Sequence, residues 1–224
     1  MELERLVTDI RGLYLEMLED ALQEAGEGAD VQIKVEPLLE QDPDVEAEGP
    51  LTDGLPSRCD LAVFREGDLE SLQNVEADEM FDFEPVEFAW GDDLQIVLLP
   101  FSWDSLALLI PGEADRDWDP LRGWFSKWAK PSTEDAKPGE LVEACHRISE
   151  PFFDGESTLI TIDLGSAPVE AFEGLLDALV ELDCKEATIG SVDADFASEE
   201  AEGDDDGEEG DEGDWEDAED SDDE

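Results

Sequence analysis

Residues 158–192 read TLITIDLGSAPVEAFEGLLDALVELDCKEATIGSV, and this stretch decides the fold that the sequence predicts. Residues 158–164 predict a strand. After the turn at residues 165–168, residues 169–182 repeat apolar side chains at helical spacing. Residues 186–192 form a closing strand. The order strand, helix, strand predicts a βαβ-like unit. The inward face of its helix is expected to carry Phe172, Leu176, Leu179 and Val180.

The chain before this unit predicts further strands. Residues 94–101 and 105–110 are the most apolar part of the sequence, and they predict a hairpin that turns at residues 102–104. Shorter strands are expected at residues 31–35 and 61–65, and at residues 81–90, where Pro85 favours an edge position. The sequence therefore predicts an α+β fold with a mixed or antiparallel sheet.

An amphipathic helix is expected at residues 2–25, where apolar side chains recur mostly every three or four positions. Its outer face carries Glu16, Asp20 and Glu24, which are successive i,i+4 neighbours. Like charges at this spacing destabilise a helix by roughly 0.2–0.5 kcal/mol per pair. Because these carboxylates do not stabilise the helix, we treat them as candidate partner-binding residues.

One change of composition marks a domain boundary. Residues 1–196 predict a single α+β globular domain, in which residues 37–58 form a surface loop rich in proline and acidic residues. Residues 197–224 contain 18 acidic side chains and no basic ones, so they predict a disordered acidic tail. In composition alone this tail resembles those of histone chaperones, and the resemblance carries no residue roles.

The negative charge is not confined to the tail. The chain has 67 acidic and 12 basic residues, for a formal net charge of −55, and residues 1–196 account for −37 of it. Fields of this size steer cationic partners but destabilise a compact state by self-repulsion. The charge therefore predicts either a basic partner or an environment of high salt, in which the repulsion is screened.

No catalytic signature is recognisable, and an enzyme is the less favoured class. The single histidine, His146, follows Cys145, and adjacent residues on a strand point to opposite faces, which argues against a nucleophile pair. The sequence contains no nucleophile elbow and no phosphate-binding glycine motif. We predict no cofactor and no metal. Asp163 and Ser166, at the strand-to-helix turn, are the candidate ligand turn.

Basic and aromatic residues alternate around residues 116–130, a mixture that can bind single-stranded nucleic acid. The negative charge of the domain argues against direct contact with nucleic acid, so we expect the tryptophans to be core residues. Three scattered cysteines without a CxxC pair predict reduced thiols and a cytoplasmic location. No apolar run is long enough for a membrane span.

The sequence thus favours a non-enzymatic acidic protein that binds a basic macromolecule, such as a DNA-binding protein or a toxin, by electrostatics. It could act as a nucleic-acid mimic or as an escort or immunity-type inhibitor; the oligomeric state is undetermined. The alternative is a salt-adapted housekeeping protein or enzyme whose acidity is environmental. Besides the three helix carboxylates, the expected partner-binding residues lie in the tail: Asp204, Asp205, Asp206, Glu208, Glu209, Asp211, Glu212, Asp214, Trp215, Glu216 and Asp217.

Overall fold

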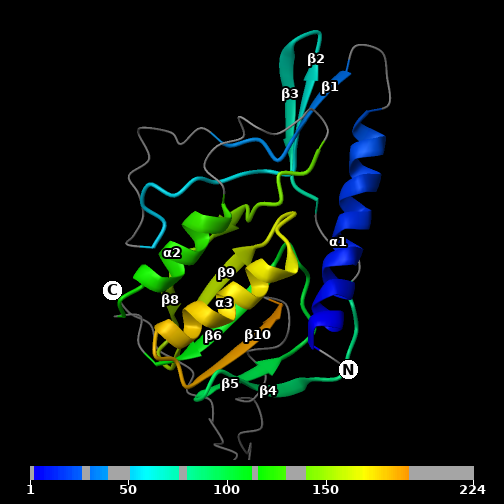
Figure 1. The fold of residues 1–224 in the computed structure, drawn as a ribbon. Coiled ribbons are helices and arrows are strands. Elements are labelled where there is room, and N and C mark those ends of the chain that lie inside the picture. Colours follow the sequence, from blue (N-terminus) through cyan, green and yellow to red (C-terminus); the bar gives the residue numbers. More distant parts are fainter. Residues whose placement is uncertain are drawn as a thin grey trace, which may run out of the picture. The chain divides into compact units, whose positions relative to one another are not determined.

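The computed structural model describes residues 3–26, 31–39, 51–75, 80–112, 116–129 and 140–191, which all belong to one compact unit. It confirms the predicted α+β class (Figure 1). The helices are α1 (Leu3–Ala25), α2 (Asp119–Trp128) and α3 (Val169–Glu181). The strands are β1 (Val31–Val35), β2 (Leu61–Arg65), β3 (Asp68–Gln73), β4 (Val86–Trp90), β5 (Leu94–Leu98), β6 (Leu106–Pro111), β7 (Arg147–Ile148), β8 (Phe152–Phe153), β9 (Ser157–Asp163) and β10 (Glu186–Ser191).

The larger of two sheets has the strand order β4-β5-β10-β6-β9-β7, and β8 also pairs with β9. Strand β10 runs parallel to β5 and antiparallel to β6, so it separates the two strands that the sequence predicted as a hairpin. That prediction was wrong. The turn between them does form, with the amide of Ser105 donating to the carbonyl of Ser102 at 3.1 Å, but the strands diverge to admit β10.

The predicted strand, helix, strand order of the βαβ-like unit is confirmed. Strands β9 and β10 are both antiparallel to β6, and therefore parallel to each other, but β6 lies between them. Helix α3 makes the crossover connection. The unit is thus a split βαβ arrangement, in which an antiparallel strand from an earlier part of the chain fills the centre.

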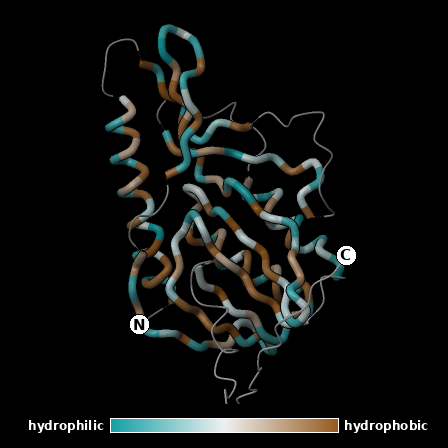
Figure 2. The backbone as a smooth tube through the Cα atoms, turned by 180° about the vertical axis from the view of Figure 1, so that it is seen from behind, coloured by the Kyte–Doolittle hydropathy of each residue, from teal (hydrophilic) through white to brown (hydrophobic). Residues whose placement is uncertain are grey.

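The smaller sheet is antiparallel with the order β1-β2-β3. Helix α1 runs beside both sheets in Figure 1, with its C-terminal half next to the small sheet. Helices α2 and α3 lie together over one face of the large sheet. The most hydrophobic segments are concentrated in the strands of that sheet, as the brown colour in Figure 2 shows. No helix in the described part of the chain is both long and apolar enough to cross a membrane.

The tryptophan-rich segment is part of the core, as expected: Trp118, Trp124 and Phe125 are buried. Trp118 occupies the N-cap position of α2, and no side chain caps the helix. The side chain of Asp117 accepts a hydrogen bond from the amide of Asp119 at 3.1 Å.

The segment at residues 37–58, predicted as a surface loop, lies partly outside the described residues. Its described parts contain no helix or strand, but they are not confined to the surface. Leu51 and Arg58 are completely buried, and Leu55 is largely buried. Residues 51–58 therefore contribute to the core, and one of the few basic side chains of the protein lies inside it.

The inward face of α3 differs from the prediction at one position. Phe172, Leu176 and Leu179 are buried as expected, whereas Val180 is 43% exposed. Val180 lies eight residues after Phe172, which rotates its side chain by about 80° from the centre of the apolar face. Leu175, rather than Val180, completes the buried stripe.

This difference gives a matched pair of substitutions. Leu176→Ala should lower the free energy of unfolding by about 2–5 kcal/mol, because it opens a cavity in the core. Val180→Ala should change it by no more than about 0.5 kcal/mol, as is usual at a surface position. Urea unfolding of both variants measures the two values. Equal losses would contradict the orientation of α3.

Candidate functional site

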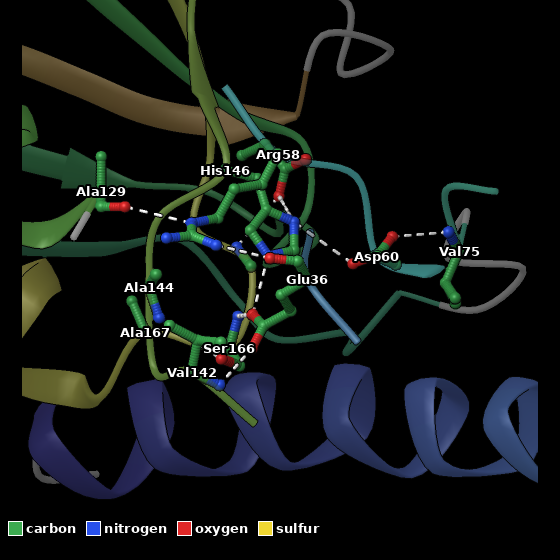
Figure 3. Close-up of polar contacts among 12 residues, drawn as sticks. Glu36, Arg58, Asp60, Val75, Ala129, Val142, Ala144, His146, Ser166 and Ala167 are labelled. Atoms are coloured by element: carbon green, nitrogen blue, oxygen red, sulfur yellow. Dashed lines mark hydrogen bonds and ion pairs between the residues drawn. The ribbon is translucent and has the colours of Figure 1, made fainter. Parts of the chain in front are cut away.

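The largest group of buried polar side chains lies where the two sheets and α1 meet. We call it the His146 cluster and define it as His146, Glu36, Asp60, Asp163, Arg58 and Tyr14. Figure 3 shows four of its members, His146, Glu36, Asp60 and Arg58. Its position follows from local structure. Glu36 comes directly after β1, Asp60 comes directly before β2, and His146 precedes β7. Each of these residues is therefore placed by the end of a strand.

His146 is completely buried, with a carboxylate on either side of its ring. Its Nε2 lies 2.7 Å from Glu36 Oε1 and forms a hydrogen bond. Its Nδ1 lies 3.2 Å from Asp60 Oδ1 and 3.8 Å from Asp163 Oδ1. The Nδ1 contacts lack hydrogen-bond geometry, so they are mainly ion pairs. The single histidine thus connects the end of β1 and the start of β2 in the small sheet to the end of β9 in the large sheet.

Asp60 joins the cluster to α1 and to the segment after β3. The hydroxyl of Tyr14 donates to Asp60 Oδ1, and the amide of Val75 donates to Oδ2 at 2.7 Å. The backbone carbonyl of Asp60 accepts from the amide of Glu36 at 2.7 Å. Both oxygens of the buried carboxylate are thereby satisfied, as a buried charge requires.

Glu36 adopts a left-handed backbone conformation with φ of 47°. Such a conformation is uncommon for a residue with a side chain, and it persists where surrounding contacts determine it. Here the carboxylate also accepts hydrogen bonds from the amides of Val142, at 2.5 Å, and Ser166, at 3.1 Å. The buried guanidinium of Arg58 donates to the carbonyl of Glu36 and, at 3.1 Å, to that of Ala129.

The turn between β9 and α3 closes the cluster from the large sheet. Gly165 has a left-handed φ of 52°, and a Cβ atom there would overlap the ring of His146 and the carbonyl of Ala144. Only glycine fits this close approach. Asp163 Oδ1 accepts a hydrogen bond from the amide of Gly165 at 2.9 Å. The turn is therefore shaped around the histidine.

These contacts change the protonation of the cluster. Burial lowers the pKa of His146, but the contacts with Asp60 and Glu36 and the charge of Asp163 outweigh it and raise the pKa to about 10. Burial raises the pKa of Glu36 and Asp60, and the contacts with His146 more than reverse this, so both are lowered. At neutral pH the cluster contains an imidazolium between two carboxylates.

The pKa values of two further members of the cluster, Asp163 and Tyr14, are raised. Burial raises the pKa of Asp163 to about 6, against the attraction of His146. Burial, reinforced by the charge of Asp60, raises the pKa of the Tyr14 hydroxyl well above its ordinary value. Tyr14 therefore remains a neutral donor to Asp60 across the physiological range.

The geometry makes the cluster a structural ion network. The ring of His146 and the carboxylates of Glu36 and Asp60 are covered by protein, so a substrate has no access to them. Cys145 is buried as well. Within the described ranges, no group of histidine, cysteine or acidic side chains has an arrangement that could hold a metal ion.

The candidate residues from the sequence are distributed over three places. Asp163 and Ser166 lie in or against the cluster, where their polar atoms contact other protein groups. Glu16, Asp20 and Glu24 are exposed on α1. The tail candidates, residues 204–217, lie outside the described residues.

No sequence pattern pointed to Glu36, Arg58 or Asp60. In a chain with 67 acidic residues, one more carboxylate beside a strand is no signal. The scarcity of basic residues was the available hint, because the one histidine and a buried arginine need anionic or carbonyl partners. Which carboxylates meet them depends on pairings between distant strands.

No protein-family model, curated protein or solved structure matches this chain.

Removing the cation should strongly destabilise the fold. His146→Leu leaves Glu36 and Asp60 buried without their counter-charge, and the expected loss is about 3–5 kcal/mol in the free energy of unfolding at neutral pH. The control Arg147→Gln removes a neighbouring cation that is half-exposed, and should cost about 1 kcal/mol or less. Urea unfolding measures both. A loss for His146→Leu no larger than the control would refute the ion network.

The pKa of His146 also predicts a pH dependence. Its folded pKa, about 10, lies above the unfolded value of 6.5, so its stabilisation is complete below about pH 6.5 and disappears as the pH rises through about 10. Urea unfolding at several pH values, compared between the wild type and His146→Leu, isolates this contribution from other alkaline titrations. A difference in stability that stays constant from about pH 6 to about pH 10 would contradict it.

Proposed function

We propose that this protein is a non-enzymatic acidic binding protein that engages a basic macromolecule by electrostatics. One observation carries the proposal: four arginines donate to backbone carbonyls, and most acidic side chains of the described residues are exposed, so the surface carries far more carboxylates than cations. Arg11 donates to the carbonyls of Ser166 and Ala167 at 2.9 and 2.7 Å. The arginines that bind backbone carbonyl oxygens in this way are Arg11, Arg58, Arg116 and Arg122.

An arginine held by backbone carbonyls does not form an ion pair through those hydrogen bonds. Two lysines lie over aromatic rings, since Lys34 lies 4.9 Å from the ring centre of Phe64 and Lys127 lies 4.7 Å from that of Trp128. Lys185, in contrast, forms ion pairs with Asp93 and Asp183. With 67 acidic and 12 basic residues in the chain, carboxylates far outnumber the cations that could pair with them. This arrangement supports attraction of a cationic surface over long distances at low salt.

The sealed His146 cluster supports a role without catalysis, because the only imidazole of the chain is committed to the fold. The partner in this proposal is a basic protein, such as a DNA-binding protein or a toxin. Two versions remain within the class: a nucleic-acid mimic, and an escort or immunity-type inhibitor. The three cysteines, Cys59, Cys145 and Cys184, are buried and not joined in disulfides, which supports a reducing, cytoplasmic setting.

A second candidate is supported by the distribution of charge. Exposed acidic residues occur on all three helices and on strands of both sheets, rather than on one face: Glu16, Asp68, Glu87, Asp119, Glu170 and Glu186 are examples. A docking face would concentrate them. The wide distribution favours a protein adapted to concentrated salt, in which the acidic surface serves hydration. Its function would then be that of a housekeeping protein or enzyme and would not depend on the acidity.

Salt dependence separates the two candidates. A binding protein should be folded at about 0.1 M salt, where the Debye length is about 10 Å, and should bind poly-L-lysine there far more tightly than at 1 M, where it is about 3 Å. Near-ultraviolet circular dichroism reports folding, and fluorescence anisotropy of labelled poly-L-lysine reports binding. Unfolding at 0.1 M with refolding at 1 M would refute the binding proposal and support salt adaptation.

Two controls complete this experiment. Poly-L-glutamate of similar charge should bind poly-L-lysine more weakly than the folded protein does; equal affinity would mean that charge alone acts. Deleting residues 197–224 should weaken binding and reduce its salt dependence, since 18 carboxylates are removed. Competition with duplex DNA, with a basic DNA-binding protein as the probe, separates the mimic from the escort.

A further inference from the structure

A cleft lies between the C-terminal half of α1 and the face of β2 and β3. Its volume is about 550 Å³, within the range of sites that hold a peptide side chain or a small ligand. The helix contributes Ala21, Glu24 and Ala25, and β2 contributes Val63 and Arg65. Strand β3 contributes Glu70 and polar side chains. The cleft is open on the surface and does not overlap the His146 cluster.

The lining suits a long cationic side chain. Ala21, Ala25 and Val63 are small and apolar, so methylene groups can pack on them while a charged end remains at the rim. Glu24 provides an opposite charge, and Glu70 provides a second carboxylate that an incoming cation would share with Arg65 of the wall. Arg65 Nε lies 3.0 Å from Glu70 Oε2, with both side chains about half-exposed.

The helix surface leading to the cleft has a matching spacing. Glu16, Asp20 and Glu24 are exposed and follow one another at four-residue intervals, and Glu24 lines the cleft. Four residues of an α-helix rise about 6 Å. Two residues of an extended chain span about 6.6 Å, and their side chains point to the same side. Every second side chain of an extended segment therefore comes near one carboxylate.

We propose that the cleft and the carboxylates of α1 leading to it bind an extended basic segment of the partner, with arginine or lysine at alternate positions. One cationic side chain enters the cleft between Glu24 and Glu70, and the next two contact Asp20 and Glu16. This inference rests on the proposed function and specifies where the partner binds and what its binding segment is like.

The test uses the full-length protein and two labelled peptides of the same composition. In one, four arginines alternate with serines; in the other, the four arginines are contiguous. The cleft variant Glu24→Gln/Glu70→Gln should lose about tenfold in affinity for the alternating peptide, since each exposed ion pair contributes up to about fivefold. The control Glu84→Gln/Glu87→Gln removes two exposed carboxylates, one just before β4 and one within it. It should lose less than about twofold in affinity for the same peptide.

A second variant, Ala21→Phe, fills the cleft without changing the charge and should weaken the alternating peptide while leaving poly-L-lysine binding unchanged. Equal losses for the cleft and control variants, or equal affinity for both peptides, would overturn the cleft as the binding site while the proposed function stands. A folded wild type that binds neither peptide nor poly-L-lysine would overturn the proposed function itself.

Discussion

The structure depends on the buried positive charge of His146. The imidazolium of His146 lies between Glu36 and Asp60, and these three residues come from separate parts of the chain. Isolated ions inside a protein cost several kcal/mol each, so no member is tolerated without the others. Because Tyr14 and the turn at Gly165 complete the same cluster, α1, the small sheet and the β9–α3 turn must assemble together. The cluster thereby fixes how the two sheets meet.

The same logic applies to two of the scarce arginines, Arg11 and Arg58. In a chain of net charge −55, an arginine at the surface would reduce repulsion only locally. Placed inside, its five donors can join segments that are distant in sequence. Arg11 joins α1 to the turn before α3, and Arg58 joins the end of β1 to the end of α2. The folded state thus combines an interior held together by cations with an outer surface dominated by anions.

This division relates the fold to the proposed binding role. The interior network buries the histidine among carboxylates, and in the proposed role the surface carboxylates are the groups that meet a partner. Charge spread over all elements accelerates encounter without choosing an orientation. The cleft beside Glu24 has an apolar lining that a partner side chain can fit, and such a fit would orient the bound partner. Steering and specificity would then reside in different parts of the surface.

Local patterns were sufficient for much of the fold. Helix α1, the strands at residues 31–35 and 61–65, and the strand, helix, strand order after residue 157 follow from side-chain periodicity, which depends only on neighbours in the sequence. Pro85 correctly indicated that β4 is an edge strand. Periodicity gave a wrong prediction at Val180, at the edge of the apolar face of α3. There a rotation of about 80° about the helix axis from Phe172 is enough to move a side chain from a buried to an exposed position.

The sequence by itself therefore determined the α+β class, most element positions and the excess of negative charge. Only the tertiary structure decided that β10 enters between β5 and β6, because strand order depends on contacts between residues far apart in the chain. Only it selected Glu36, Asp60 and Asp163 from 67 acidic residues as the partners of His146. The physical reason is that burial of a charge is a property of the assembled fold, whereas the presence of a charge is a property of the sequence.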